Sequence, residues 1–475
     1  MSTVTKRTIL AHAKALRERE YSSRELTEEF YSEIERKDKL TQAHLALSKD
    51  EAFRAADNAD KLLSRGEGSV LCGIPCTVKD NIMTQGTPTT CASRMLENYI
   101  PPYDATVVEL LKRECAVILG KTNLDEFAMG SDNQSSAFKK TVNPYDRERV
   151  PGGSSGGGAA AVADGTAAYA IGSDTGGSAR QPAAFCSLVS MKPTYGRVSR
   201  YGLCALASSM DQIAPITRTV ADNAAVLSAL ACHDRRDATS LEKGREDYTT
   251  GICDRVRSTK IGICTEMTDI AEPEVRDAVY KTADILKSLG CEVFEISLPS
   301  LSHSLAAYRI ICCAEASSNM SRFDGIRYTE KVGGELFTEA RQSLLGPEVR
   351  RRILLGTWLL SHENYEKYYL KALQAKQLIT DEMKEAFTCC DALISPTVLH
   401  TAFRPDTMPK DRFGTYSGDV CCMSANLSGM PSLSVPVGFD SDGMPIGALL
   451  TGNFLSEGLL YRLGNAVETV QKEDE

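Results

Sequence analysis

Two loops rich in glycine and serine carry the residue types that could do chemistry. The first reads PGGSSGGG at residues 151–158, with Ser154 and Ser155 at its middle, and the second reads GSDTGGS at residues 172–178 and ends on Ser178. Glycine lets the backbone approach a ligand closely and adopt a positive φ. Backbone N–H groups presented in this way can stabilise a negatively charged oxygen, and serine hydroxyls can act as nucleophiles. We therefore expect an anion or oxyanion site that contains hydroxyl nucleophiles.

A lysine at the end of an apolar stretch is the third candidate. Lys79 follows LCGIPCTV at residues 71–78, a short, apolar and partly β-branched run that predicts a buried strand. A buried lysine is costly unless it is paired or neutral, and a neutral amine can act as a base. Taken singly, each candidate has an ordinary explanation. A serine in a glycine-rich loop is usually a turn residue or a cap, and a lysine at a strand end is usually a solvated charge.

Four interpretations of the first loop compete. A phosphate-binding P-loop needs Lys and then Ser or Thr after the glycines, but GGA stands at residues 157–159, and the dinucleotide fingerprint G-x-G-x-x-G is absent. Residues 152–156 fit G-x-S-x-G, the nucleophile elbow of α/β-hydrolases, which also needs a downstream acid and a histidine. His233, His303, His362 and His400 follow, but none has a distinctive local sequence. The fourth interpretation is a Ser–Ser–Lys arrangement in which Lys79 replaces histidine as the base.

Alternating helices and strands must position these residues. The first 65 residues are predicted to be helical, with a capping box at residues 22–25. Asp104 is expected to cap a helix that ends at Lys112, and a second helix is expected over residues 274–289 with Gly290 after its end. Strands are predicted at residues 71–79, 116–119, 260–263, 291–297, 391–395 and 432–435. This alternation is typical of an α/β fold, and the absence of repeats or linkers predicts one domain over residues 1–475, with residues 1–65 packed on it.

Composition limits the classes of function. The chain has 475 residues, of which 42% are hydrophobic and 25% charged, as in ordinary globular proteins. Its net charge of −9 argues against this chain being the main contact with nucleic acid. Residues 1–24 are charged and lack the apolar core of a secretory signal, and no apolar run is long enough for a membrane helix. We therefore expect a cytoplasmic protein.

Sixteen cysteines invite a metal or disulfide interpretation, but their spacing does not support one. There is no C-x-x-C motif, and the six histidines are scattered along the chain. We expect reduced cysteines that are mostly buried as small apolar residues, with no metal site in this chain.

Longer motifs give the chain a family resemblance. GIPCTVKDN at residues 73–81, the two Gly/Ser loops and RQPA at residues 180–183 resemble the amidase signature family in sequence, order and spacing. Four further stretches are similar to one branch of that family, the A subunits of glutamyl-tRNA(Gln) amidotransferases. They are KPTYGRVSRYGL at residues 192–203, ASSMDQI at 207–213, EASSN with RFDGIRY at 315–328, and VRRRILLGT at 349–357.

The resemblance implies a fold and a catalytic set. The fold is a large central mixed β-sheet covered by helices on both faces. Ser154 would attack the side-chain amide of glutamine, and Ser178, held through a cis peptide bond after Gly177, would relay the proton between Ser154 and a neutral Lys79. The oxyanion would be bound by the N–H groups of Thr175, Gly176 and Gly177. Asp174 and Arg180 would orient the loops as structural partners.

A glutamine pocket is also implied. Met129 and Gly130 lie beside the substrate in the family, where either could equally be packing. The α-carboxylate calls for a guanidinium, which the family places in the basic run at residues 350–352. Arg352 is the first choice in that run, and three arginines on a helix could equally be solvated surface with one buried member. Asp419 is the choice for the α-ammonium, and Tyr308 is a weaker candidate for the same pocket.

The resemblance implies partners as well. The family's A subunit works with a B subunit that binds tRNA, uses ATP and Mg²⁺ and receives ammonia, and with a small C subunit. This heterotrimer converts Glu-tRNA(Gln) to Gln-tRNA(Gln), or Asp-tRNA(Asn) to Asn-tRNA(Asn), and no cofactor belongs to the A subunit. Two alternatives are a stand-alone amidase of the same fold and a non-catalytic scaffold protein. The stretches at residues 315–319 and 349–357 argue against the first, and the intact Lys79, Ser154 and Ser178 argue against the second.

Overall fold

One mixed β-sheet runs through the whole chain. The computed structural model describes residues 4–328, 336–407 and 418–474. The sheet in this part of the chain has eleven strands in the order β1-β3-β2-β4-β6-β5-β10-β11-β9-β7-β8. Their bounds are β1 His44–Leu47, β2 Pro75–Lys79, β3 Val117–Thr122, β4 Tyr169–Asp174, β5 Val189–Lys192, β6 Gln212–Thr217, β7 Lys260–Cys264, β8 Glu292–Ile296, β9 Ala392–Pro396, β10 Ser432–Phe439 and β11 Pro445–Gly452.

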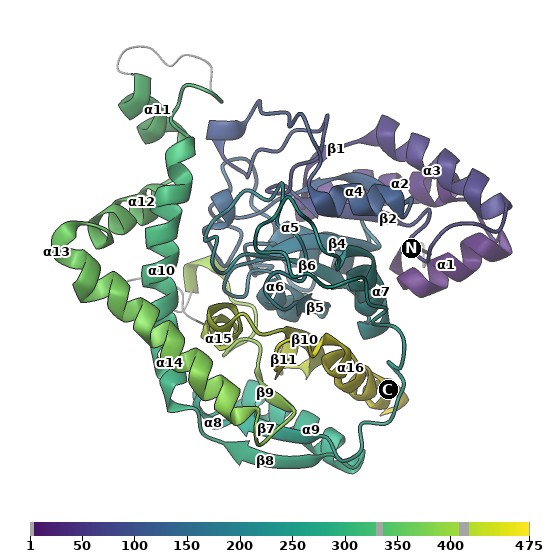
Figure 1. Ribbon diagram of the computed structural model, residues 1–475. Helices are drawn as coiled ribbons and strands as arrows, with labels where there is room; N and C mark the ends of the chain where they lie inside the picture. The colour runs from purple at the N-terminus through teal and green to yellow at the C-terminus, as the bar shows by residue number, and fades with distance from the viewer. Residues whose placement is uncertain (1–3, 329–335, 408–417, 475) are drawn as a thin grey trace.

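Helices connect and cover the strands. They are α1 Ile9–Glu18, α2 Ser23–Thr41, α3 Lys49–Ser64, α4 Thr106–Arg113, α5 Gly156–Asp164, α6 Arg180–Phe185, α7 Val220–Leu230, α8 Thr265–Thr268, α9 Pro273–Ser288, α10 Ser304–Asn319, α11 Leu336–Leu344, α12 Pro347–Leu359, α13 His362–Asn364, α14 Lys371–Ala386, α15 Val420–Ser428 and α16 Glu457–Asp474. Short 3₁₀ segments include η3 Glu126–Ala128, and η6 Tyr365–Leu370 is a π-helix. Figure 1 shows α10, α12 and α14 on one side of the sheet and the N-terminal helices on the other.

The sheet is covered on both faces, as the resemblance implied. Successive residues of a strand point to opposite faces. On β4, Tyr169 and Ile171 join a large apolar cluster that includes residues of α4, α7, α9 and α16. Ala170 between them joins a separate cluster of small residues that includes most of the apolar side chains of α5. The α/β fold class predicted from the sequence is therefore confirmed.

Local signals predicted most elements well. Ser22 and Glu25 form the expected capping box at the start of α2. Gly290 follows the end of α9 with a φ of +90°. The predicted strands correspond to β2, β3, β7, β8, β9 and β10, with ends displaced by a few residues. These elements share strong periodicity and clear terminators, which are the short-range features that a sequence displays.

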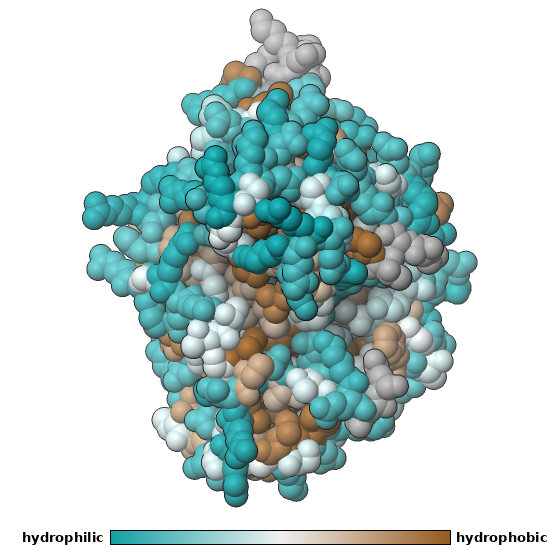
Figure 2. Space-filling model, turned by 90° about the vertical axis from the view of Figure 1, so that its right-hand side faces the viewer, coloured by the Kyte–Doolittle hydropathy of each residue, from teal (hydrophilic) through white to brown (hydrophobic). Residues whose placement is uncertain are grey.

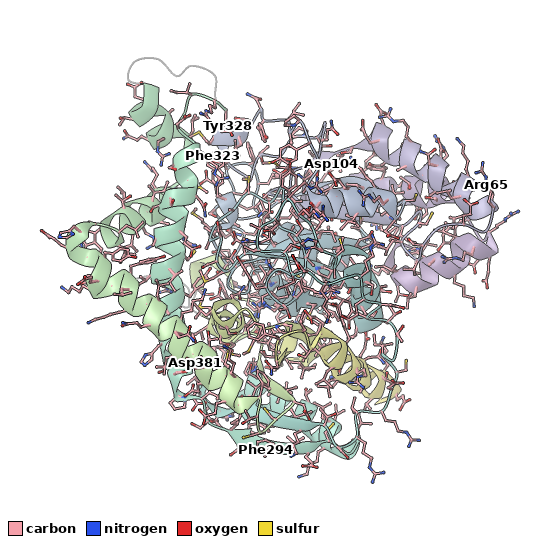
Figure 3. The ribbon with its side chains drawn as sticks, viewed as in Figure 1. Arg65, Asp104, Phe294, Phe323, Tyr328 and Asp381 are labelled. Atoms are coloured by element: carbon pink, nitrogen blue, oxygen red, sulfur yellow. The ribbon has the colours of Figure 1, made fainter. Side chains whose placement is uncertain are left out.

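Two local predictions are wrong. Residues 1–65 are not wholly helical, because β1 pairs antiparallel with β3 through His44 and Thr122. That pairing joins residues far apart in the chain, so its cause is invisible to local periodicity. Asp104 does not cap α4, whose N-cap is Ala105. The Asp104 carboxylate instead accepts hydrogen bonds from the Gln85 N–H at 2.8 Å and the Lys112 ammonium at 2.6 Å. Figure 3 labels Asp104 among the side chains of the structure.

The sheet brings the candidate loops to one edge. β2 and β4 are parallel neighbours, with Val78 opposite Ile171. Carboxyl ends of parallel strands meet at the same edge of a sheet. Lys79 at the end of β2 therefore lies beside the second Gly/Ser loop, which begins with the last three residues of β4. The first loop enters the same place because α5, which it precedes, packs against β2 and β4.

The surface is largely polar on the face in view. The face drawn in Figure 2 is mostly hydrophilic, with apolar side chains gathered near its middle and lower part. Among the described residues, no helix is both long and apolar enough to cross a membrane.

The sixteen cysteines are free thiols, and most of them are buried.

Candidate active site

The ammonium of Lys79 lies at the centre of a buried group of hydroxyls. Its Nζ contacts Ser154 Oγ at 2.7 Å, Ser155 Oγ at 2.8 Å and Ser173 Oγ at 3.0 Å. Asn81 donates from its side-chain amide to Ser173 Oγ at 2.9 Å and so orients that hydroxyl. Ser173 and Asn81 were not among the sequence candidates. Ser173 stands directly before Asp174 in the second Gly/Ser loop, and Asn81 stands two residues after Lys79 in the motif at residues 73–81. Their positions in these motifs could have identified them.

Burial suits Lys79 to the role of a base. Only 1% of its surface is exposed. Removal from water disfavours the charged form and lowers the pKa of Lys79 to about 7, although the carboxylates of Asp125, Asp174 and Asp211 oppose that change. A substantial fraction of neutral amine is therefore present at neutral pH. This buried environment agrees with the expectation that the pKa of Lys79 is lowered.

This pKa predicts the acid side of the activity profile. Protonated Lys79 has no lone pair to accept a proton, so kcat/KM for amide hydrolysis should fall tenfold per pH unit below about pH 7. The profile should be measured between pH 5 and 9, with circular dichroism at each pH to show that the protein stays folded. A profile that stays level down to pH 5 would contradict the assignment of Lys79 as the base.

The structure brings the three predicted residues together, but in a different order. We expected Ser178 between Lys79 and Ser154, and this order is wrong. Lys79 contacts Ser154 directly, and within the described residues no hydrogen bond joins it to Ser178. Ser178 lies on the other side of the serine loop, where its carbonyl accepts from the Ser155 N–H at 2.8 Å. The cis peptide bond also differs from expectation, because it joins Gly153 to Ser154 and not Gly177 to Ser178.

Exposure separates the two serines further. Ser154 has no exposed surface, whereas 7% of Ser178 is exposed. Ser154, which contacts Lys79, is therefore the more enclosed of the two serines, and Ser178 is the more accessible.

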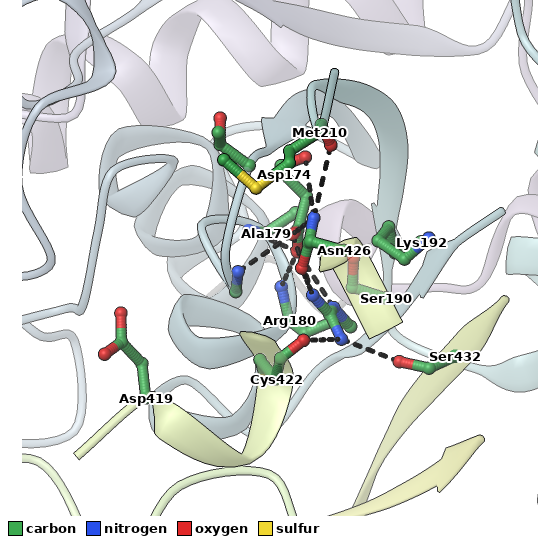
Figure 4. A network of polar contacts seen from close by, with 12 residues as sticks. Asp174, Ala179, Arg180, Ser190, Lys192, Met210, Asp419, Cys422, Asn426 and Ser432 are labelled. Carbon is green, nitrogen blue, oxygen red and sulfur yellow. Dashed lines mark hydrogen bonds and ion pairs between the residues drawn. The ribbon is translucent and has the colours of Figure 1, made fainter. Parts of the chain in front are cut away.

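The second loop is held by a buried ion pair. Asp174 Oδ1 lies 2.8 Å from Arg180 Nη2, and both side chains are fully buried. Arg180 also donates to Ser432 Oγ at 2.7 Å, and Asn426 donates to Asp174 Oδ1 at 3.1 Å, which joins α15 and β10 to the loop (Figure 4). Burial would raise the pKa of Asp174, but the Arg180 guanidinium and the surrounding donors hold it well below its usual range. Asp174 and Arg180 therefore act as the structural partners that the resemblance implied.

The Asp174 carboxylate also binds one of the N–H groups that were expected to form the oxyanion hole. The Gly177 N–H, one of the three expected oxyanion donors, donates to Asp174 Oδ1 at 2.9 Å in this structure. Within the described residues, the N–H groups of Thr175, Gly176 and Ser178 make no hydrogen bond. Gly177 has a φ of +121°, a conformation that glycine adopts readily. This turn lets the backbone reach Asp174 and leaves the three other donors for a ligand.

Tyr308 forms a wall over this loop. A Cβ added to Gly176 would lie 2.5 Å from the Tyr308 ring, so only glycine permits the approach. Tyr308 belongs to α10, and Arg352 on α12 is close enough to influence its ionisation. Arg352 donates from Nε to Glu348 Oε1 at 2.7 Å and from Nη1 to Cys312 Sγ at 3.6 Å.

Arg352 is the more enclosed of the two arginines that share Glu348. Its side chain is 16% exposed, against 47% for Arg351. The Arg351 guanidinium contacts the Glu348 carboxylate at 2.7 and 2.8 Å on the outer side of the helix. Arg350 has a buried Nε without a hydrogen bond in the described structure, and it lies near the Glu126 carboxylate. Burial and nearness to Tyr308 thus support the preference for Arg352.

Asp419 provides a carboxylate beside the same loop. It precedes α15 and accepts from Ser131 Oγ at 3.0 Å. Burial raises the pKa of Asp419 to about 6, against the effect of that hydrogen bond and of the nearby Arg309 and Arg352. A Cβ added to Gly177 would lie 3.6 Å from Asp419 Cβ, so this carboxylate borders the oxyanion loop.

The segment with Met129 and Gly130 closes the same region. Met129 is fully buried, and Gly130 packs so tightly on Asp125 that a Cβ would overlap its carboxylate. Gln181 ties this segment to the first loop, because it donates to the Ser131 carbonyl at 2.9 Å and accepts from the Gly153 N–H at 2.8 Å. The structure therefore places the segment that contains Met129 and Gly130 next to the first Gly/Ser loop.

The set as a whole combines a base, two hydroxyls, three N–H donors, one arginine and one aspartate. Such a set can transfer an acyl group from an amide to a serine, and it can recognise a substrate that carries one positive and one negative charge. Among the described residues, no group of three or more His, Cys, Asp or Glu side chains is arranged to hold a metal ion.

Comparison with known proteins agrees with this chemistry. The amidase family model matches residues 25–461. The A subunit of glutamyl-tRNA(Gln) amidotransferase from Thermoanaerobacter pseudethanolicus is 46% identical over 463 residues, covering 96% of this chain and 95% of the relative.

Two solved structures are similar as well. The crystal structure of the A subunit of glutamyl-tRNA(Gln) amidotransferase from Thermotoga maritima has a TM-score of 0.82 and 40% identity, covering 98% of this chain and 95% of that one. Peptide amidase from Stenotrophomonas maltophilia has a TM-score of 0.85 and 29% identity, covering 98% and 97%. The chain therefore belongs to the amidase family.

Proposed function

We propose that this chain is the glutamine-hydrolysing component of a tRNA-dependent amidotransferase. The observation that carries the proposal is a buried Ser–Ser–Lys set beside a loop that Asp419 borders and that Tyr308, a neighbour of Arg352, also contacts. Glutamine differs from a simple amide by its α-carboxylate and α-ammonium, and these two groups fit the charges of Arg352 and Asp419. Relatives named as A subunits of amidotransferases support the same conclusion.

The geometry suggests how the reaction would proceed. Ser178 attacks the side-chain amide carbon of glutamine, and its proton passes through Ser154 to neutral Lys79. The oxyanion is bound by the N–H groups of Thr175, Gly176 and Ser178. Return of the proton to the amide nitrogen releases ammonia and leaves a glutamyl ester on Ser178. Water then hydrolyses the ester by the same proton path and gives glutamate.

The partners follow from this role. Ammonia released here would be used by a B subunit that binds tRNA and consumes ATP with Mg²⁺, together with a small C subunit. The acceptor would be Glu-tRNA(Gln) or Asp-tRNA(Asn). The proposal includes a cytoplasmic location, where aminoacyl-tRNA is made and where free thiols such as the sixteen found here persist. Co-purification from the native host, with identification of the accompanying proteins, tests the heterotrimer.

The alternative of a stand-alone amidase predicts a different substrate preference. The direct test is ammonia release from glutamine and from a small neutral amide by the same preparation. The proposal expects a clear preference for glutamine, expressed as kcat/KM. Equal kcat/KM for the two substrates would favour the stand-alone amidase, for which the similarity to peptide amidase is the relevant observation.

Removing either charge of the pocket should weaken glutamine recognition. Arg352→Ala and Asp419→Ala should each raise the glutamine KM on the order of 10²-fold, because the substrate charge is then buried without its partner. Hydrolysis of a neutral amide should change far less. Arg351→Ala is the comparison on the same helix and should have a much smaller effect, since that side chain is 47% exposed. Equal losses on both substrates in Arg352→Ala would mean that Arg352 is structural.

A further inference from the structure

The Arg352 guanidinium is held at two of its nitrogens. Nε donates to Glu348 Oε1 at 2.7 Å, and Nη1 donates to Cys312 Sγ at 3.6 Å. Within the described residues, Nη2 makes no hydrogen bond. A guanidinium binds a carboxylate through two parallel N–H bonds from one edge. With Nε occupied by Glu348, the edge left for a ligand is the one formed by Nη1 and Nη2.

The two contacts differ in strength, and that difference defines the open edge. A carboxylate is a strong acceptor for a charged donor, whereas a neutral thiol is a weak one. Burial raises the pKa of the Cys312 thiol to about 12, so it stays neutral. A ligand carboxylate can therefore replace Cys312 at Nη1, but it cannot replace Glu348 at Nε without loss.

Glu348 is itself fixed and its charge is balanced. It lies one helical turn before Arg352 on α12, on the same face of the helix. Arg351 contacts both of its oxygens, from Nε to Oε2 at 2.7 Å and from Nη2 to Oε1 at 2.8 Å. One arginine neutralises the carboxylate, so the positive charge of the other remains for a ligand.

The open edge lies near the reaction site. Cys312 is four residues after Tyr308 on α10, and so shares a face with it. The Tyr308 ring packs against Gly176 in the oxyanion loop. The anchored guanidinium is thus tied through α10 to the loop that would bind the reacting amide.

We propose that Glu348 is a positioning residue that determines glutamine specificity by holding Arg352 at Nε, so that its Nη1–Nη2 edge receives the α-carboxylate. This inference rests on the proposed function. Glu348 touches no substrate in this scheme and acts only through Arg352. Its removal should therefore affect substrates with an α-carboxylate and spare those without one.

A double-mutant cycle tests the proposal. Four proteins are compared for ammonia release: the unmodified chain, Glu348→Gln, Arg352→Ala and the double variant. Glu348→Gln should raise the glutamine KM about tenfold, the size expected when a charge-assisted hydrogen bond becomes one to a neutral amide, with kcat little changed. In the Arg352→Ala background the same change should have no further effect on KM. Glu363→Gln, an exposed carboxylate on α13, is the matched control and should behave like the unmodified chain.

The outcomes separate the possible roles of Glu348. A rise in KM of equal size in both backgrounds, or an equal loss on a neutral amide, would overturn the proposal and make Glu348 structural. If Glu348→Gln does not fold, Glu348→Asp gives the same test, because it keeps the charge but shortens its reach. If the unmodified chain, assayed with its partner proteins, hydrolyses a neutral amide but not glutamine, the proposed function itself fails.

Discussion

Ser178→Ala is expected to abolish ammonia release from glutamine, with kcat reduced about 10⁴-fold or more. The change removes the most exposed hydroxyl of the set, which sits in the loop with the N–H donors. The fold should survive, since Ser178 Oγ makes no hydrogen bond within the described structure. The measurement is glutaminase activity together with the melting temperature.

Two comparisons make that test specific. Ser154→Ala should also be strongly impaired, because it breaks the path from Ser178 to Lys79, while Ser155→Ala should be much milder. A serine-reactive phosphonate, followed by peptide mapping, should label Ser178 and leave Ser154 unmodified. Labelling of Ser154 would restore the assignment suggested by the sequence alone. Residual activity within tenfold of the unmodified chain in Ser178→Ala would exclude it as the nucleophile.

Lys79→Arg is expected to be as inactive as Lys79→Met, with a loss of roughly 10³-fold or more in kcat. Arginine can still donate hydrogen bonds to Ser154 and Ser155, so it keeps a cation and donors in the site. It remains protonated at any pH at which the protein is folded, however, and cannot accept a proton. The comparison therefore separates the role of a base from that of a charge or a hydrogen-bond donor.

An outcome in which arginine supports activity and methionine does not would assign Lys79 an electrostatic role. Melting temperatures are needed beside the rates, because arginine is larger than lysine and the site is almost completely buried. Glutamine binding measured by calorimetry serves as a second control. Both variants should retain it, since Arg352 and Asp419 are unchanged.

The residues of the site were identifiable from the sequence because each stands in a short, distinctive context. Lys79 ends an apolar run, and the glycine loops surround Ser154 and Ser178. The same holds for the start of α5 and the capping box of α2, where a few consecutive residues determine the backbone. Arg352 was chosen within a run of three arginines only by its place before Ile353, and burial supports that choice.

Tertiary structure decided what each of these residues contacts. Lys79 and Ser154 are 75 positions apart, and only the parallel pairing of β2 with β4 and the packing of α5 bring Lys79 to Ser154 rather than to Ser178. Asp174 takes the Gly177 N–H because Arg180 and Asn426 fix its carboxylate from two other elements. Periodicity and turn residues act over a few positions and predict the elements and the residue types. Hydrogen bonds between distant segments depend on distances of a few tenths of an ångström, which only the packed structure determines.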